Sequence, residues 1–522
     1  MNIHIKNKIY PYYTEVILKQ IRFLKVKARS VSMKECQLPL ISATNSLFWK
    51  SSYLWFILYL LFNFQASAQK VNINVHVRGV YESKITLLPL PGTTAFKSIK
   101  PIISAGIKNG ETTTFSIAES KLPALFVLRF DYKENENSTP YPCEKQIFLY
   151  KQNIELWANP MYCINNDSSY FQKDEKENTM FAQFTEENGI RKEKLGLLQN
   201  FLMNYDDTES KFYKQGIKEY KKRRSEYNLW LTKQSTQYQA LFVSHSFQFQ
   251  YVPKIAFKCS EADRMQSVTE HYFDGIDFND TLLLNTTELK KWMDSYVNIY
   301  GTMVKTEAQT DSLFTLAGKR AIEKARPGHP KVYGWMVDYF YSGYESFNMA
   351  EGIKMLEPYL NDTNCLTTKR MAIEKRLKGM ETLLIGTLAP DFTLKNDIGI
   401  AVRFSDYKTN SRYKLLLFWS ADCGHCKELI NKLYTWHQQL NDKKLVEVFA
   451  LSLDETETEI PIWQSAITQF PAWNHIRCEG GVNSKEADAY FILSTPVMIL
   501  VDAKTNKIVA LPETMQQLMK VL

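Results

Sequence analysis

The feature that most constrains the fold of this chain lies between Leu415 and Leu440. An apolar run ending at Trp419 is followed by Cys423-Gly-His-Cys426, and an amphipathic stretch then extends from Lys427 to Leu440. This order predicts a buried strand, a tight turn and a helix, with the first cysteine at the start of the helix. Unpaired backbone N–H groups and the helix dipole favour a thiolate at that position. A cysteine three residues on can displace a mixed disulfide from within the same turn.

A second element follows about seventy residues later, in the run Ser494-Thr-Pro496-Val-Met-Ile-Leu-Val501. Proline cannot donate to a β ladder, so Pro496 belongs at the first residue of a strand or on an edge. These two elements, and the opening Gly386-Thr-Leu-Ala-Pro390-Asp-Phe392, resemble the periplasmic thioredoxin-like family of the TlpA/ResA type. Peroxiredoxins share the opening, and Cys423-Gly-His-Cys-Lys427 matches the active-site pentapeptide of protein disulfide isomerases. The resemblance covers residues 382–522.

The resemblance implies an α/β thioredoxin fold and a thiol–disulfide oxidoreductase that exchanges disulfides with protein substrates. Cys423 is then the nucleophile and Cys426 the resolving thiol. It also implies a cis Thr495–Pro496 bond beside the Cys-x-x-Cys turn. The residues expected to contact substrate are Trp419, Gly424, His425, Thr495 and Pro496.

The charge on His425 favours the Cys423 thiolate, and so favours the reduced form of the pair. This directs the pair toward oxidant or isomerase behaviour, as in protein disulfide isomerase (about −180 mV) rather than thioredoxin (about −270 mV). Leu417 stands where thioredoxins bury a carboxylate that takes the proton of the resolving thiol. Periplasmic relatives often place a Glu three residues after the second cysteine, where this chain has Leu429. Proton transfer then relies on water or Glu428.

Other functions stay open on the sequence. A thiol peroxidase usually carries Pro-x-x-x-Thr/Ser-x-x before its cysteine; Ser420 fits that pattern, but Leu416 replaces the proline. Copper delivery would use a Cys-x-x-x-Cys spacing and a distant histidine; His475 is available, but the cysteine spacing differs. An exported binding or scaffold protein with a vestigial thioredoxin domain is the non-enzymatic alternative.

The expected partners follow from the dithiol chemistry. They are protein thiols and disulfides, with a membrane or periplasmic thiol as electron donor. No metal and no cofactor is expected beyond the redox-active disulfide Cys423–Cys426. The net charge of +8 includes eight Lys/Arg residues before residue 35, and no basic face interleaved with aromatic residues is evident, so nucleic-acid binding has no support.

The N-terminus predicts export. Residues 53–64 form a 12-residue apolar run, with Lys50 before it and Ala66-Ser-Ala68 after it, as in a cleaved secretory signal. A spanning helix needs roughly 20 apolar residues, so a periplasmic protein is favoured over one anchored by this run. Residues 1–68 are therefore assigned to an N-terminal extension and signal peptide, and Met33 is a candidate start.

Cysteine usage fits an oxidising compartment. Cleavage after Ala68 leaves seven cysteines, an odd number, so at least one thiol is unpaired or intermolecular. Cys143 and Cys163 flank one end of an expected hairpin. They either form a structural bridge or are buried as small hydrophobic residues.

Three further segments complete the multidomain organisation. Residues 69–165 alternate apolar and polar from Val71 and contain several short β runs, which predicts a small antiparallel β-sandwich. Its position resembles the small β domain ahead of Bacteroidetes-type thioredoxin modules. Residues 172–378 change to helical periodicity and predict a helical domain. Residues 382–522 predict the thioredoxin-like order strand, helix, strand, helix, two strands and helix.

Overall fold

The computed structural model describes residues 70–90, 100–306, 309–347, 349–440 and 445–522. The expectations about the extension, the signal segment and its cleavage site lie outside these residues. Among the residues described, no helix is long and apolar enough to cross a membrane. The chain divides into two compact units, the first reaching Ser342 and taking in Asn364–Leu366, the second comprising Gly343–Thr363 and Thr367–Leu522.

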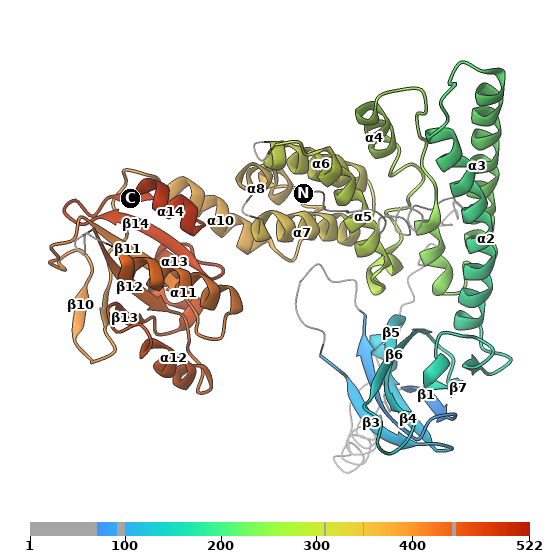
Figure 1. Cartoon of the computed structure of the whole chain (residues 1–522), viewed down its shortest axis with the longest axis horizontal. Helices are drawn as coiled ribbons and strands as arrows, with labels where there is room; N and C mark the ends of the chain where they lie inside the picture. Colours follow the sequence, from blue (N-terminus) through green and yellow to red (C-terminus); the bar gives the residue numbers. More distant parts are fainter. Residues whose placement is uncertain (1–69, 91–99, 307–308, 348, 441–444) are drawn as a thin grey trace, which may run out of the picture. The chain divides into compact units, whose positions relative to one another are not determined.

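The described part of the first unit begins with eight strands in two four-stranded sheets, ordered β4-β1-β7-β8 and β3-β2-β5-β6 (Figure 1). Alternate side chains of β1 are buried, as a strand with one face on a core requires. Residues of both sheets share one hydrophobic core that includes Ile73, Leu87 and Phe130. The strands are β1 (Lys70–Val77), β2 (Glu82–Pro89), β3 (Ile103–Lys108), β4 (Thr112–Ala118), β5 (Ala124–Lys133), β6 (Tyr141–Leu149), β7 (Ile154–Ala158) and β8 (Tyr170–Phe171).

The arrangement differs from the expected antiparallel sandwich in one pairing, since β1 pairs with β7 in parallel. A long connection through β2–β6 separates these two strands, which makes parallel pairing possible. Strand β3 and the short β8, which lies beyond residue 165, were not expected. Cys143 and Cys163 are joined by a disulfide, which decides between the two alternatives that the sequence left open.

Helices make up the rest of the first unit and extend into the second. Helix α3 begins at Ser210, whose side chain accepts a hydrogen bond from the Tyr213 N–H and so caps the helix. The α-helices are α2 (Glu177–Met203), α3 (Lys211–Gln237), α4 (Glu261–Glu270), α5 (Glu288–Met303), α6 (Thr310–Ala325), α7 (Pro330–Ser346), α8 (Ala350–Met355), α9 (Glu357–Leu360) and α10 (Arg370–Thr382). Short 3₁₀ helices are η2 (Glu119–Lys121), η3 (Pro160–Tyr162), η4 (Val243–Gln250) and η5 (Thr281–Asn285).

The second unit contains a five-stranded sheet of order β13-β12-β11-β14-β15 and a separate β9–β10 hairpin. Its strands are β9 (Thr393–Lys395), β10 (Ala401–Arg403), β11 (Tyr413–Trp419), β12 (Val446–Ser452), β13 (Asn474–Arg477), β14 (Val497–Asp502) and β15 (Ile508–Ala510). Its later helices are α11 (Gly424–Gln439), α12 (Glu459–Ile467), η7 (Gly481–Asn483), α13 (Lys485–Ala489) and α14 (Met515–Val521).

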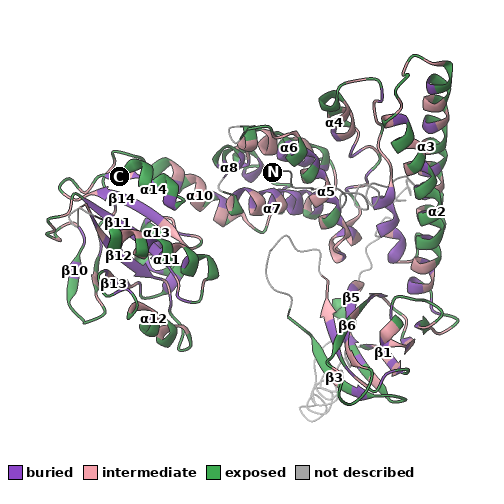
Figure 2. Cartoon of the chain, in the orientation of Figure 1, coloured by how far each residue is buried: buried purple, intermediate pink, exposed green. Residues whose placement is uncertain are grey.

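Strand β11 is the centre of this sheet, and all seven of its residues are buried (Figure 2). It pairs in parallel with β12 and antiparallel with β14. Its side chains alternate between two cores. Leu415, Leu417 and Trp419 belong to the core that contains residues of α11, α12 and α14, while Leu416 and Phe418 belong to the core on the other face.

The second unit extends beyond the predicted 382–522, because α8, α9 and α10 belong to it. Helix α10 lies close against the segment that precedes β14. A Cβ built on Gly379 would lie 2.8 Å from the Cβ of Phe491, so the helix approaches this closely only because residue 379 is glycine.

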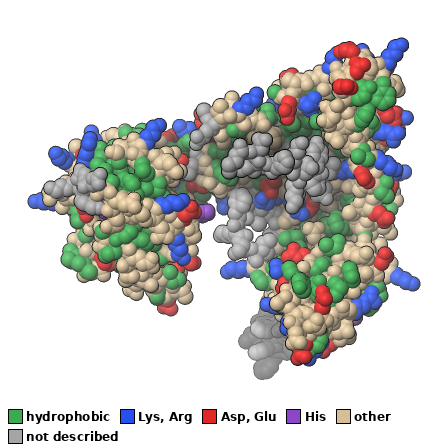
Figure 3. Space-filling view, viewed as in Figure 1, with side chains coloured by type: hydrophobic (Ala, Val, Ile, Leu, Met, Phe, Trp, Pro, Cys, Tyr) green, Lys and Arg blue, Asp and Glu red, His purple; other side chains and the backbone are tan. Residues whose placement is uncertain are grey.

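On the face drawn in Figure 3, the described Lys and Arg side chains are scattered rather than gathered into one basic patch.

Candidate active site at the Cys-x-x-Cys turn

The sheet brings the two expected elements together at one edge. Strand β11 ends at Trp419, directly before the cysteine turn, and antiparallel pairing places Phe418 opposite Val497 at the start of β14. The Thr495–Pro496 segment, which enters β14, therefore lies beside the turn that leaves β11. The Sγ atom of Cys423 lies 3.7 Å from the carbonyl oxygen of Thr495 and donates to it. The Thr495–Pro496 peptide bond is cis, as predicted.

Cys423 is the N-cap residue of α11, the position that the sequence predicts. Its Sγ atom accepts a hydrogen bond from the backbone N–H of Cys426 at 3.2 Å. The side chain is half-buried and therefore open to a reacting partner. The first-turn N–H groups and the helix dipole favour negative charge on this sulfur.

Cys426 lies one turn into the helix and is fully buried. Its side chain belongs to the core that contains Leu417 and Trp419. The pKa of Cys426 is raised to about 12. Burial is the largest cause, and the hydrogen bond with the Cys423 side chain is the next. The two cysteines are not joined to one another in this structure and differ in solvent access, as a nucleophile and a resolving thiol do.

Asp454, which follows the end of β12, supports the turn, and the sequence reasoning missed it. The carboxylate is 1 % exposed and accepts hydrogen bonds from the Ser420 hydroxyl at 2.6 Å and the Ala421 N–H at 2.9 Å. The Ser452 hydroxyl donates to it as well, at 2.7 Å. The available signal was an aspartate just past the end of an apolar strand in the same sheet as the cysteine strand.

The carboxylate positions considered from the sequence do not supply a base beside Cys426. Leu417 is fully buried and apolar, as the sequence implies. The Glu428 carboxylate is exposed and pairs with Lys432 at 2.6 Å, so it is turned toward solvent. Asp454 is a buried acid that contacts the turn, but its oxygens accept hydrogen bonds from Ser420, Ala421 and Ser452.

The remaining predicted contact residues surround the turn in different ways. Gly424 and His425 are exposed in the first turn of α11, and Thr495 is partly buried. Trp419 is buried at the end of β11 and belongs to the same core as Ala421 and Cys426. His475 lies buried in β13, where burial lowers its pKa and its Nε2 lies 2.8 Å from the Phe470 carbonyl. The described residues contain no cluster of three or more His, Cys, Asp or Glu able to hold a metal.

Comparison with known proteins finds a family match in the C-terminal part of the chain, which contains the cysteine turn. Residues 385–504 match the model of the AhpC/TSA family. A thioredoxin domain of a thiol-disulfide oxidoreductase from Bacteroides vulgatus is 27 % identical, covering 26 % of this chain and 94 % of that one, with a TM-score of 0.23. A thiol-disulfide oxidoreductase from Bacteroides fragilis is 28 % identical, covering 26 % and 96 %, with a TM-score of 0.23.

The structure of a thioredoxin-like protein from Bacteroides caccae aligns with a longer part of the chain. It is 20 % identical and covers 52 % of this chain and 96 % of that one, with a TM-score of 0.34. Comparison with curated proteins gives no match. The C-terminal domain is thus thioredoxin-like and of the AhpC/TSA type, in agreement with its sheet order and with the cysteine turn at the end of β11.

Proposed function

We propose that the C-terminal domain is a thiol–disulfide oxidoreductase that exchanges disulfides with protein substrates through Cys423 and Cys426. The observation that carries the proposal is the asymmetry of the two thiols. Cys423 caps α11 and is open to a substrate, whereas Cys426 is fully buried one turn away. A lone reactive cysteine or an incidental pair does not need this arrangement.

The reaction follows from that asymmetry. The Cys423 thiolate attacks one sulfur of a substrate disulfide, the substrate S–S bond breaks, and the leaving sulfur departs as a thiolate that takes up a proton. Cys426 then loses its proton and attacks Cys423, which releases the second substrate sulfur as a thiol. The substrate gains two electrons and the Cys423–Cys426 pair becomes a disulfide. Run in reverse, the same steps oxidise a substrate dithiol.

Export to the periplasm is part of the proposal. The disulfide between Cys143 and Cys163 supports it, because structural disulfides persist in oxidising compartments. In that compartment the oxidised Cys423–Cys426 pair is returned to the dithiol by a membrane or periplasmic thiol donor.

The test compares two single-cysteine variants of the full chain with a protein disulfide such as insulin. Cys426→Ser is expected to trap covalent mixed disulfides, seen as a mass increase that dithiothreitol reverses. Cys423→Ser is expected to abolish both trapping and turnover. Adducts that form on Cys423→Ser would reverse the two roles, and absence of insulin reduction by the unsubstituted protein would favour a scaffold with a vestigial domain.

A thiol peroxidase is the second candidate, because the matched family model is that of AhpC/TSA. Ser420, which matches the peroxidase pattern, donates its hydroxyl hydrogen to Asp454. Peroxide consumption by the dithiol protein, measured beside insulin reduction, separates the two reactions. We expect disulfide exchange to be the faster; a faster reaction with hydrogen peroxide would favour the peroxidase.

A further inference from the structure

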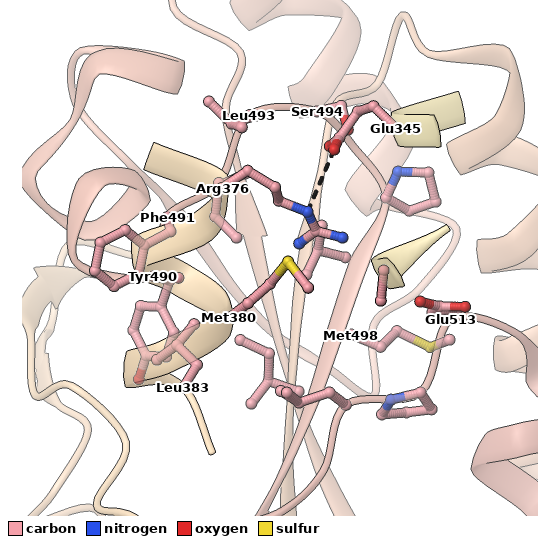
Figure 4. Close-up of a pocket in the computed structure, with 18 of the residues that line it drawn as sticks. Glu345, Arg376, Met380, Leu383, Tyr490, Phe491, Leu493, Ser494, Met498 and Glu513 are labelled. Atoms are coloured by element: carbon pink, nitrogen blue, oxygen red, sulfur yellow. Dashed lines mark ion pairs between the residues drawn. The ribbon is translucent and has the colours of Figure 1, made fainter. Parts of the chain in front are cut away.

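A cavity of about 730 Å³ lies within the second unit, next to the segment that enters β14. Its walls come from α8, from α10 with residues 383–385 after it, from residues 490–494 and 496–499, and from residues 511–513 after β15. The end of α7 adds Glu345. Figure 4 shows Arg376 reaching from its helix toward Glu345, with Met380 beside it and with Met498 and Glu513 on the facing side. The cavity is therefore built partly by helices that precede the thioredoxin-like fold.

The cavity and the candidate active site meet at the segment that contains Thr495. Ser494 and Pro496 line it, and Thr495, between them, has its carbonyl oxygen 3.7 Å from the Sγ atom of Cys423. An extended chain advances about 3.3 Å per residue. A polypeptide that places a sulfur against Cys423 thus needs only a few residues to bring a side chain to the cavity.

The rim of the cavity is apolar and open to solvent. Ile385 is 71 % exposed, Leu384 50 % and Leu511 40 %, and all three line the cavity. Met380 and Leu383 of the α10 segment continue this surface inward. Covering it with a leucine-sized side chain would remove apolar area from water on both sides, which favours binding.

The cavity also offers both hydrogen-bond donors and acceptors. Arg376 pairs with Glu345 at 3.3 Å between Nε and Oε2, and the exposed Glu513 lies on the facing wall. Burial raises the pKa of both carboxyl groups, while the Arg376 charge opposes the shift. A polypeptide main chain presents N–H donors and C=O acceptors together, whereas an acyl chain presents neither. The lining therefore suits a peptide segment better than a lipid tail.

We propose that this cavity binds an apolar side chain of an extended polypeptide substrate, a few residues from the cysteine that reacts with Cys423. The inference rests on the proposed function, since it names the substrate feature that the same active site selects. Helix α10 and the end of α7 then contribute to substrate choice without taking part in the exchange of sulfur atoms.

The test uses the full chain carrying Cys426→Ser, which holds the first mixed disulfide. Its substrates are short peptides, each containing one cysteine that is joined by a disulfide to a small thiol. Within the series, a single Leu, Ser or Asp is moved through the positions from three residues before the cysteine to three residues after it. At one of these positions Leu is expected to give trapping at least about tenfold faster than Asp, a ratio equivalent to about 1.4 kcal/mol. Equal rates for Leu and Asp at every position would overturn the proposal.

Two variants in the same background locate the effect. Ile385→Asp places a charge on the rim of the cavity, and Met380→Trp fills the cavity; each is expected to bring the Leu-to-Asp ratio down toward one. Ile398→Asp is the matched control, because Ile398 is 72 % exposed, lies in the β9–β10 turn and does not line the cavity. A ratio unchanged by both cavity variants, or lowered equally by the control, would overturn the assignment to this cavity.

A small disulfide without a peptide, such as hydroxyethyl disulfide, separates this inference from the proposed function. Reaction of Cys423 with it, combined with equal rates for all peptides, removes the cavity proposal and leaves the oxidoreductase. Failure to react with any disulfide removes the oxidoreductase, and the cavity proposal with it.

Discussion

Asp454 connects the cysteine turn to the neighbouring strand. Its carboxylate accepts hydrogen bonds from Ser420, Ala421 and Ser452 while almost completely removed from solvent. A buried group that loses such a partner keeps its desolvation cost without the compensating bond. The conformation of residues 420–422, which set the position of Cys423, therefore depends on one carboxylate outside the motif.

We expect Asp454→Ala to lower the free energy of unfolding by about 2–4 kcal/mol, because it leaves buried donors without an acceptor. Asp454→Asn keeps one acceptor oxygen and is expected to lose less. Glu457→Ala, an exposed position in the same connection, serves as the control and is expected to change stability by no more than about 0.5 kcal/mol. Urea unfolding measures all three, and a loss in Asp454→Ala no larger than in the control would contradict the role of the carboxylate.

The protonation of Cys426 predicts a pH-dependent resolving step. Burial raises the pKa of Cys426 to about 12, and only the thiolate attacks the mixed disulfide. Below this pKa the thiolate fraction rises tenfold per pH unit, so the resolving rate is expected to rise about tenfold per unit from pH 6 to pH 9. Single-turnover oxidation at saturating small disulfide measures this step.

The control for this pH series is the attack by Cys423 alone, measured in Cys426→Ser over the same range. A resolving rate that levels off below pH 8 would mean that a nearby group accepts the Cys426 proton. Leu417 is apolar and Glu428 is bonded to Lys432, so neither position supplies that group in this structure.

The cysteine motif and the Pro496 run identify both halves of the site from the sequence, because each motif is local. The support from Asp454 was not predicted from the sequence. It depends on β12 lying parallel beside β11, with Ser452 opposite Trp419, which is a contact between distant segments.

At the scale of elements, the strands and helices that bear the chemistry follow the sequence pattern closely. Strand β11 ends at Trp419, where the apolar run ends, and α11 begins directly after Cys423, as predicted. Strands β9, β10 and β13 and helix α13 were missed, because each is five residues or shorter and shows too little periodicity to be recognised. The parallel β1–β7 pairing was missed because short β runs joined by turns favour antiparallel neighbours.

The packing of α10 on the segment before β14 predicts a large effect at one glycine. We expect Gly379→Ala to lower the free energy of unfolding of the second unit by about 1–3 kcal/mol, because the new Cβ would lie 2.8 Å from the Cβ of Phe491. Gly343→Ala is the matched control. Gly343 also lies in a helix, but its Cβ would meet no atom within 4 Å, so the substitution is expected to stabilise by about 0.5–1 kcal/mol.

Chemical denaturation followed by tryptophan fluorescence compares the two glycine variants. Opposite signs would support close packing of α10 against Phe491. Stabilisation by both substitutions would show that α10 can move away from this segment at no cost, and the wall that it gives to the cavity would then not be fixed.

At the scale of the whole molecule, the two compact units predict two separable unfolding events. The Cys143–Cys163 disulfide belongs to the first unit, and Cys423 and Cys426 belong to the second. Reagents that act on disulfides therefore have different targets in the two units: a structural bridge in one and the reactive pair in the other.

We expect Cys143→Ser combined with Cys163→Ser to lower the free energy of unfolding of the first unit by about 2–4 kcal/mol, the usual effect of removing a bridge that closes a loop of this size. Dithiothreitol is expected to lower the same transition in the unsubstituted protein, and to leave the transition of the second unit unchanged apart from keeping Cys423 and Cys426 as a dithiol. Pulse proteolysis in increasing urea, with fragments identified by mass, assigns each transition to its unit. Cys259→Ser, which removes a free thiol of the first unit, is the control and should not shift either transition.

A shift of both transitions on reduction would contradict the assignment of the bridge to the first unit alone. If only the first transition shifts, the stability of the first unit depends on a bridge that a reducing compartment would remove. The second unit, by contrast, must cycle between dithiol and disulfide to carry out the proposed reaction. One chain can meet both requirements when its surroundings keep Cys143–Cys163 oxidised and a specific donor reduces Cys423–Cys426. The half-buried Cys423 is accessible to such a donor. In the structural bridge, by contrast, the sulfur of Cys163 is fully buried in the core of the β-sheets of the first unit.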